Sequence, residues 1–288
     1  MDDYPPDFKK TVAFIPQRLS DILRDRACEE RKIKSPLLSS DFDGLRLRGT
    51  QVDNDASSDG SRFANPSPDG REPQPDPGRV EGGRENVINH MERCFGKVEN
   101  VLREVKSDLL NLAVHVIPPR DESTPHVLFT TGISDRPMKA PREVYIERRV
   151  ELMLALPPYW KLHREALKDE RWNWPIRGLK TMARLTHEHQ TWLDMGHTIP
   201  NGEPPVPYAP HVPFCCALIT PPLVLPPEMH VVLLPNGEPL RILAPVWLHR
   251  GEVSLKLLYG VHLLFDRLDE IGASEIVDLN REDVSRQN

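Results

Sequence analysis

The segment YIERRVELMLALP (Tyr145–Pro157) carries the clearest structural signal in this sequence. Glu151, Met153 and Ala155 alternate there with larger apolar side chains at positions 150, 152, 154 and 156. Residues two apart lie on the same face of a strand, so this period predicts a β-strand.

Five further runs predict strands by the same alternation or by short apolar length. A double proline ends the first of them, and the turn-rich residues 123–125 before the second favour a hairpin. The sequence NGEP (Asn236–Pro239) predicts a second hairpin between the last two. The five runs are residues 109–117, 126–134, 214–220, 229–235 and 240–248.

Three helices are predicted from apolar residues three and four apart. The first spans residues 85–105, the second begins at an Asn173 cap with Pro175 in its first turn, and the third runs unbroken over 251–272. Together these elements predict an α+β (mixed α/β) fold: a largely antiparallel sheet flanked by helices, in a single globular domain over residues 85–288.

Residues 1–83 differ from the rest of the chain, and we interpret them as a mostly disordered N-terminal extension. Residues 49–83 are rich in Asp, Ser, Pro and Gly, and cannot bury enough apolar surface to offset backbone entropy. A short helix is predicted near residues 17–30, where Leu19, Ile22 and Leu23 have helical spacing and Ser20 is a suitable cap. That helix docks on the main domain or on a partner; in one hypothesis, residues 10–30 cover a groove of the domain as an internal ligand.

Composition excludes several classes of protein. A net charge of −6 argues against a nucleic-acid-binding surface. No apolar run approaches the roughly 20 residues of a membrane helix, and the acidic N-terminus is not a signal peptide. The four cysteines form no C-x-x-C pair, and we interpret Cys215 and Cys216 as small buried residues in a reducing compartment. The sequence therefore predicts a soluble, cytoplasmic protein without membrane or nucleic-acid partners.

The segment TWLDMGHTIPNGEP (Thr191–Pro204) is the strongest candidate for chemistry. Asp194 and His197 suit a general base and its orienting carboxylate, and His187 and His189 would complete a metal-dependent hydrolase. Helix positions two apart face different ways, however, and no further spaced Cys or His completes a ligand set. The prediction is therefore no catalytic residue, no metal and no cofactor, with the metal hydrolase kept as the alternative.

The order of seven segments resembles the Suppressor of Fused-like domain family in its bacterial form. The resemblance covers residues 85–284, and TTGISDRPM (Thr130–Met138) and GHTIPNG (Gly196–Gly202) are its most specific parts. The segments are LAVHVIPP, FTTGISDRPM, VELMLALPPYW, WPIRGLKTMARL, TWLDMGHTIPNGEP, APVWLHRGEVSLKL and VDLNREDV.

This resemblance implies a non-enzymatic protein-binding domain, and bacterial relatives of this type are often immunity proteins that neutralise a toxin domain. The expected partner is a protein that adds an extended strand to an exposed sheet edge. Neither its identity nor the oligomeric state follows from the sequence. The predicted partner-binding residues are Asp135, Arg136, Asp194, His197 and Asn201.

Overall fold

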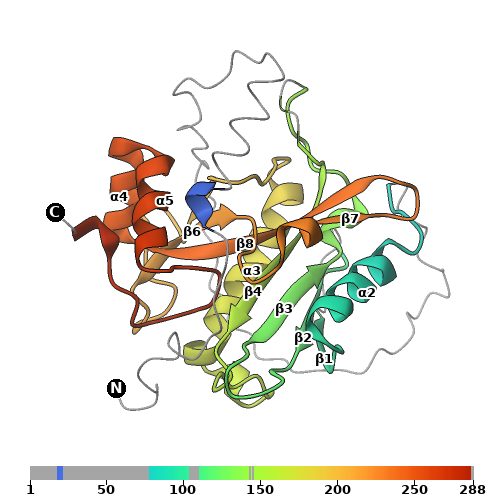
Figure 1. The fold of residues 1–288 in the computed structure, drawn as a ribbon, viewed down its shortest axis with the longest axis horizontal. Coiled ribbons are helices and arrows are strands. Elements are labelled where there is room, and N and C mark those ends of the chain that lie inside the picture. Colours follow the sequence, from blue (N-terminus) through green and yellow to red (C-terminus); the bar gives the residue numbers. More distant parts are fainter. Residues whose placement is uncertain (1–17, 22–77, 104–109, 143, 145, 287–288) are drawn as a thin grey trace.

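The computed structural model describes residues 18–21, 78–103, 110–142, 144 and 146–286. Its centre is an eight-stranded sheet of order β1-β2-β3-β4-β8-β6-β5, with β7 paired to β8 (Figure 1). The strands are β1 (Asn100–Arg103), β2 (Ala113–Ile117), β3 (His126–Thr131), β4 (Arg149–Leu156), β5 (Thr198–Pro200), β6 (Phe214–Thr220), β7 (Val231–Leu233) and β8 (Pro239–His249).

Strand β4, the predicted strand of residues 145–157, lies in the middle of the sheet and is buried along its whole length. It pairs antiparallel with β3 and parallel with β8, whereas every other pairing between the strands is antiparallel in the described residues. Both predicted hairpins, β2–β3 and β7–β8, are confirmed. The α+β class with a largely antiparallel sheet is likewise confirmed.

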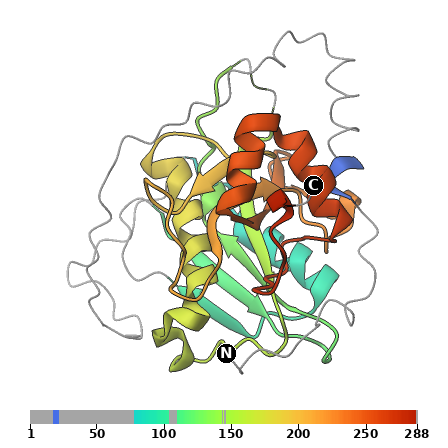
Figure 2. The ribbon, with the colours of Figure 1, turned by 90° about the vertical axis from the view of Figure 1, so that its left-hand side faces the viewer.

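Helices cover both faces of this sheet (Figure 2). Helix α3 (Glu170–Glu188) shares a buried cluster with Leu152 and Leu154, while α2 (Gly83–Phe95) shares another with Met153. The alternation of β4 thus divides its side chains between two cores. Helices α4 (Arg250–Tyr259) and α5 (Val261–Glu270) form a third cluster with β6 and the end of β8.

Two predicted helices are wrong in extent. The helix over 85–105 ends at Phe95, and residues 100–103 instead pair with β2 as strand β1. The spacing of Val98 and Leu102 suits either conformation, and pairing with the sheet decides for the strand; residue 105 lies outside the described residues. The single helix over 251–272 breaks at Gly260, whose φ of 87° a right-handed helix cannot contain.

The start of α3 also differs from the prediction. The helix is capped by Asp169, four residues before the predicted cap Asn173. The Asp169 carboxylate accepts the N–H of Arg171. Pro175 lies inside the helix.

Of the N-terminal extension, the structure describes only Arg18–Asp21 and the residues from Gly78 onward. Leu19, Ser20 and Asp21 are helical. Residue 17 and residues 22–30 lie outside the described residues, as does most of the region predicted to be disordered. In the part of the chain that the structure describes, no helix is both long and apolar enough to cross a membrane.

Candidate partner-binding site

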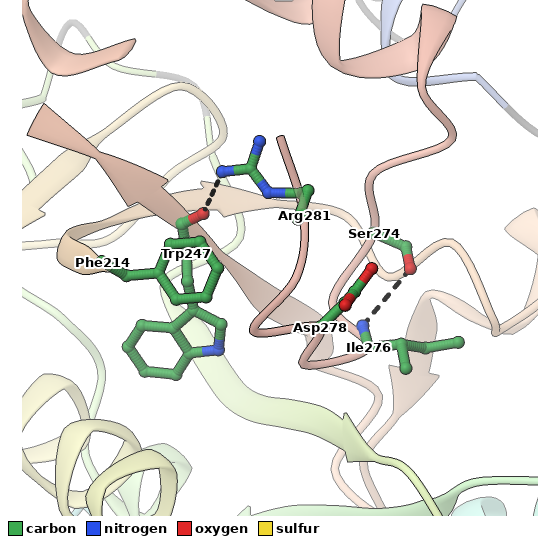
Figure 3. Close-up of a pocket in the computed structure, with 6 residues that line it drawn as sticks. All are labelled: Phe214, Trp247, Ser274, Ile276, Asp278 and Arg281. Atoms are coloured by element: carbon green, nitrogen blue, oxygen red, sulfur yellow. Dashed lines mark hydrogen bonds between the residues drawn. The ribbon is translucent and has the colours of Figure 1, made fainter. Parts of the chain in front are cut away.

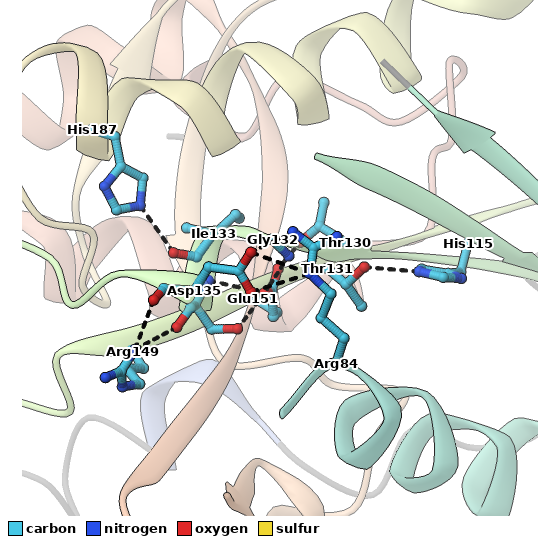
Figure 4. Close-up of polar contacts among 11 residues, drawn as sticks. Arg84, His115, Thr130, Thr131, Gly132, Ile133, Asp135, Arg149, Glu151 and His187 are labelled. Atoms are coloured by element: carbon cyan, nitrogen blue, oxygen red, sulfur yellow. Dashed lines mark hydrogen bonds and ion pairs between the residues drawn. The ribbon is translucent and has the colours of Figure 1, made fainter. Parts of the chain in front are cut away.

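The segment TTGISD (Thr130–Asp135) folds around the buried carboxylate of Glu151 on β4 (Figure 4). The hydroxyls of Thr130 and Ser134 each donate at 2.6 Å, and the N–H groups of Gly132 and Ser134 donate at 2.9 and 3.0 Å. A Cβ at Gly132 would lie 2.5 Å from the carbonyl oxygen of Asn111, so only glycine fits this bend. Burial outweighs the four bonds and raises the pKa of Glu151.

Asp135, a predicted partner-binding residue, follows this cage and forms a salt bridge with Arg84 of α2, with Nε 3.1 and 3.2 Å from its oxygens. Arg136, the next predicted residue, is half-buried. Arg149 holds the backbone just before Arg136, because its Nη1 donates to the carbonyl of Ser134 at 2.7 Å. This motif mainly joins β3, β4 and α2.

The candidate metal ligands do not gather into a site. The Nε2 of buried His187 donates to the carbonyl of Ile133 at 2.9 Å, His189 lies exposed at the end of α3, and Asp194 is 3.5 Å from Nη1 of Arg241. The His197 ring packs edge-on against Trp192, with centroids 5.7 Å apart. Within the described ranges, no group of three or more His, Cys, Asp or Glu side chains has metal-binding geometry. The structure does not support the metal-hydrolase alternative.

The segment 191–204 lies at one edge of the sheet and is held there by hydrogen bonds to β6. Asp194 is buried and accepts the N–H of Met195 at 2.8 Å. The N–H of Gly196 donates to the carbonyl of Ile219, and the N–H of Ile219 donates to the carbonyl of His197. The chain therefore joins β6 two residues before β5 begins. The pairing with β6 makes Thr198–Pro200, in the middle of this segment, the strand β5.

Asn201 holds the connection after β5 in shape. Its backbone N–H donates to the carbonyl of Cys215 at 2.9 Å. Its side-chain amide donates to the carbonyls of Val206 and Pro207 at 2.9 and 3.2 Å. Val206 donates back to the carbonyl of Asn201. The side chain therefore closes a short loop rather than pointing to solvent alone.

Strand β5 forms one end of the sheet, and the described residues contain no strand beyond it. Ile199 pairs directly with Ala217, so the alternation of an antiparallel ladder turns the backbone N–H and C=O of Thr198 away from β6. Pro200 carries no N–H and limits pairing at the other end of the strand.

Helix α4 contacts this edge through two basic side chains. Lys256 donates to the hydroxyl of Thr198 at 3.2 Å, and Arg250 donates to the carbonyl of Pro205 at 2.5 Å. The three residues after Lys256, namely Leu257, Leu258 and Tyr259, are 57%, 74% and 67% exposed. They end the first of the two helices into which the predicted helix over 251–272 divides. We name these three residues with β5 the β5–α4 surface.

A separate pocket between β6, β8 and the C-terminal segment is too small for a substrate (Figure 3). Its volume of about 10 Å³ leaves room for about one water molecule. Arg281 of its lining donates to both carboxylate oxygens of buried Glu252 at 2.6 Å and to the carbonyl of Trp247 at 2.8 Å. This paired charge fastens the C-terminal segment to the fold.

The described cysteines are free thiols and are poor nucleophiles. Burial raises the pKa of Cys216 to about 12, and it also raises the pKa of Cys215 and Cys94. Since the thiolate is the reactive form, these side chains stay protonated near neutral pH. The interpretation of Cys215 and Cys216 as small buried residues is confirmed.

The described part of the chain is an α+β domain built on one mixed, mostly antiparallel sheet. The model of the family described as Suppressor of fused protein (SUFU) matches residues 109–282, which is more than half of the chain. The chain belongs to the Suppressor of fused family, as the sequence resemblance predicts. Among curated proteins, none matches it.

One solved structure supports the fold, and two others are similar at a lower level. A SUFU homolog from Neisseria gonorrhoeae is 17% identical with a TM-score of 0.54, over 72% of this chain and 100% of that one. A structure of the Sufu–Fu complex is 14% identical, with a TM-score of 0.49 over 70% of this chain and 92% of that one. Drosophila Suppressor of Fused is 14% identical, with a TM-score of 0.48 over 70% of this chain and 51% of that one.

Proposed function

We propose that this chain is a non-enzymatic binding module that captures a protein partner on the β5–α4 surface. The observation that carries the proposal is the run of three exposed apolar residues in α4, the helix whose Lys256 bonds to Thr198 of the edge strand β5. Exposed apolar residues that adjoin one another are typical of interaction surfaces, and an edge strand offers backbone groups to an extended peptide. Family membership is consistent with this function.

The predicted residues take graded roles in this proposal. His197 and Asn201 lie on either side of β5 and fix its path, so they border the partner rather than react with it. Asp194, which is buried and close to Arg241, stabilises the chain just before β5. Asp135 and Arg136 belong to a different motif, and we propose that they contribute less to binding.

We further propose that the partner is a toxin domain with a basic surface and that the chain acts as its immunity protein in the cytoplasm. The net charge of −6 supports electrostatic steering of such a partner. Free, buried cysteines suit a reducing compartment.

Two matched substitutions test the binding surface. Leu258→Asp places a charge in the β5–α4 surface, and Leu233→Asp does the same at a comparably exposed leucine (66%) on β7. The ligand is the polypeptide encoded by the adjacent reading frame, and titration calorimetry measures its Kd. We expect Leu258→Asp to weaken binding at least about tenfold, roughly 1.4 kcal/mol, and Leu233→Asp to change it by less than about twofold. Equal effects of the two substitutions contradict the assignment of the surface.

Growth of cells that express this polypeptide, with and without the chain, tests the immunity role. Rescue of growth by the native chain, and its loss with Leu258→Asp, is the expected result. A polypeptide that binds but is harmless to cells refutes the immunity role and leaves the binding module intact.

A further inference from the structure

Leu19 is a core residue that comes from far outside the domain in sequence. It is 0% exposed and belongs to the same buried cluster as Leu264, Phe265 and Leu268 of α5. The next described residue after Asp21 is Gly78. The helical turn that carries Leu19 lies against α5 in both ribbon views (Figures 1 and 2).

Asp269 of α5 binds the backbone of this turn. One carboxylate oxygen accepts the N–H of Leu19 and the other accepts the N–H of Ser20, both at 2.8 Å. The first N–H groups of a helix have no partner within the helix, and a carboxylate is a strong acceptor for them. Asp269 therefore caps a helix that it does not belong to, and Ser20, the cap predicted from the sequence, lies within the turn.

The position of Asp269 in its own helix is unfavourable. It lies in the last turn of α5, where the helix dipole disfavours negative charge. The two hydrogen bonds from Leu19 and Ser20 stabilise this carboxylate, whereas its place in α5 does not. An apolar hole for one leucine, with an acceptor for two backbone N–H groups at its rim, is a receptor for the start of a helix.

We propose that this receptor, defined by Asp269, Leu264, Phe265 and Leu268, is a second interaction site. Its ligand is the first turn of an amphipathic helix that carries a leucine, and Arg18–Asp21 occupies it as a tethered internal ligand. A helix of the same kind on a protein partner displaces the internal one. This site lies at the opposite end of α5 from the β5–α4 surface, and the inference goes beyond the function proposed there.

The tether sets the strength of this competition. Residues 22–77 join the turn to the domain, and the entropy of closing a loop rises only slowly with its length. A tethered ligand acts at an effective concentration on the order of 1 mM or below. A free helix must overcome that concentration to bind the native chain, and it binds readily once the internal turn is disabled.

A labelled peptide of residues 13–27, added to full-length chains, tests the proposal by fluorescence anisotropy. Leu19→Asp in the chain places a charge in the apolar hole and releases the internal turn. We expect the peptide to bind this variant at least about tenfold more tightly than the native chain. Asp269→Asn added to Leu19→Asp removes the charged acceptor and weakens peptide binding about tenfold; the peptide that itself carries Leu19→Asp does not bind.

Three results overturn the proposal. The peptide binds the native chain and the Leu19→Asp variant equally, or it binds no folded variant, in which case Leu19 is only a core residue. A concentration-dependent dimer of the native chain that Leu19→Asp abolishes assigns the turn to a second copy instead. Leu19→Ala, which weakens the contact without adding charge, replaces Leu19→Asp if that variant does not fold, and intermediate peptide affinity is then expected.

Discussion

The two motifs that most specifically carry the family resemblance have opposite places in the molecule. Thr130–Met138 turns inward and supplies four hydrogen bonds to a carboxylate on the central strand. Gly196–Gly202 lies at the end of the sheet, where Thr198 of β5 bonds to α4, a helix that carries an exposed apolar run. The difference shows that a distinctive motif can serve mainly to hold the fold together, as the four bonds to Glu151 do.

Glu151→Ala has the largest expected effect. The substitution leaves two N–H groups and two hydroxyls buried without their acceptor, and each unsatisfied group costs about 1–3 kcal/mol. We expect a loss of about 3–5 kcal/mol in the free energy of unfolding, measured by urea denaturation. Glu151→Gln keeps an acceptor oxygen and should cost less than half as much. A loss below about 1 kcal/mol for Glu151→Ala would show that the inward motif does not stabilise the fold.

Asn201→Ala comes next. It removes two side-chain bonds to the carbonyls of Val206 and Pro207, in a partly exposed loop. We expect a loss of about 1–2 kcal/mol in the free energy of unfolding. Hydrogen exchange should quicken at residues 201–207 and stay unchanged at residues 130–138. Faster exchange in both motifs would mean that they are coupled, against the comparison.

The pH dependence of stability sharpens the inward half of the comparison. Burial raises the pKa of Glu151 above its ordinary value of 4.5, so between 4.5 and the folded pKa the folded chain binds more protons than the unfolded chain. This stabilisation is complete below 4.5 and is lost as pH rises through the folded pKa. Relative to Glu151→Gln, the native free energy of unfolding should fall by at most about 1.4 kcal/mol per pH unit. A difference that rises with pH would mean that its hydrogen bonds outweigh burial.

His197→Ala has the smallest expected effect on stability. The ring contacts Trp192 edge-on and is half-buried, so its loss should cost about 1 kcal/mol or less, seen as a small fall in Tm. Partner affinity should fall by a larger factor than Tm suggests, because the residue borders β5. Turnover of any small molecule that this substitution abolishes in a folded chain would refute the non-enzymatic assignment.

Periodicity predicted most of the sheet correctly, since alternation and burial follow from the geometry of a strand. It failed where the same spacing suits two conformations, as at Val98 and Leu102, or where one residue interrupts a regular pattern, as at Gly260. The edge strand β5 was missed because three residues are too few to show a period. Glu151 was visible as a charge within the alternating apolar part of the strand, but nothing local indicated which groups would surround it.

The fold class, the central strand, the hairpins and the family can all be read from the sequence, because each depends on local period, turn chemistry or order along the chain. Three features appear only in the folded chain: one motif encloses Glu151, His187 and His197 contact different neighbours, and Leu19 packs beside Asp269. Those outcomes depend on contacts between residues up to 250 positions apart, whose free energy no local pattern encodes.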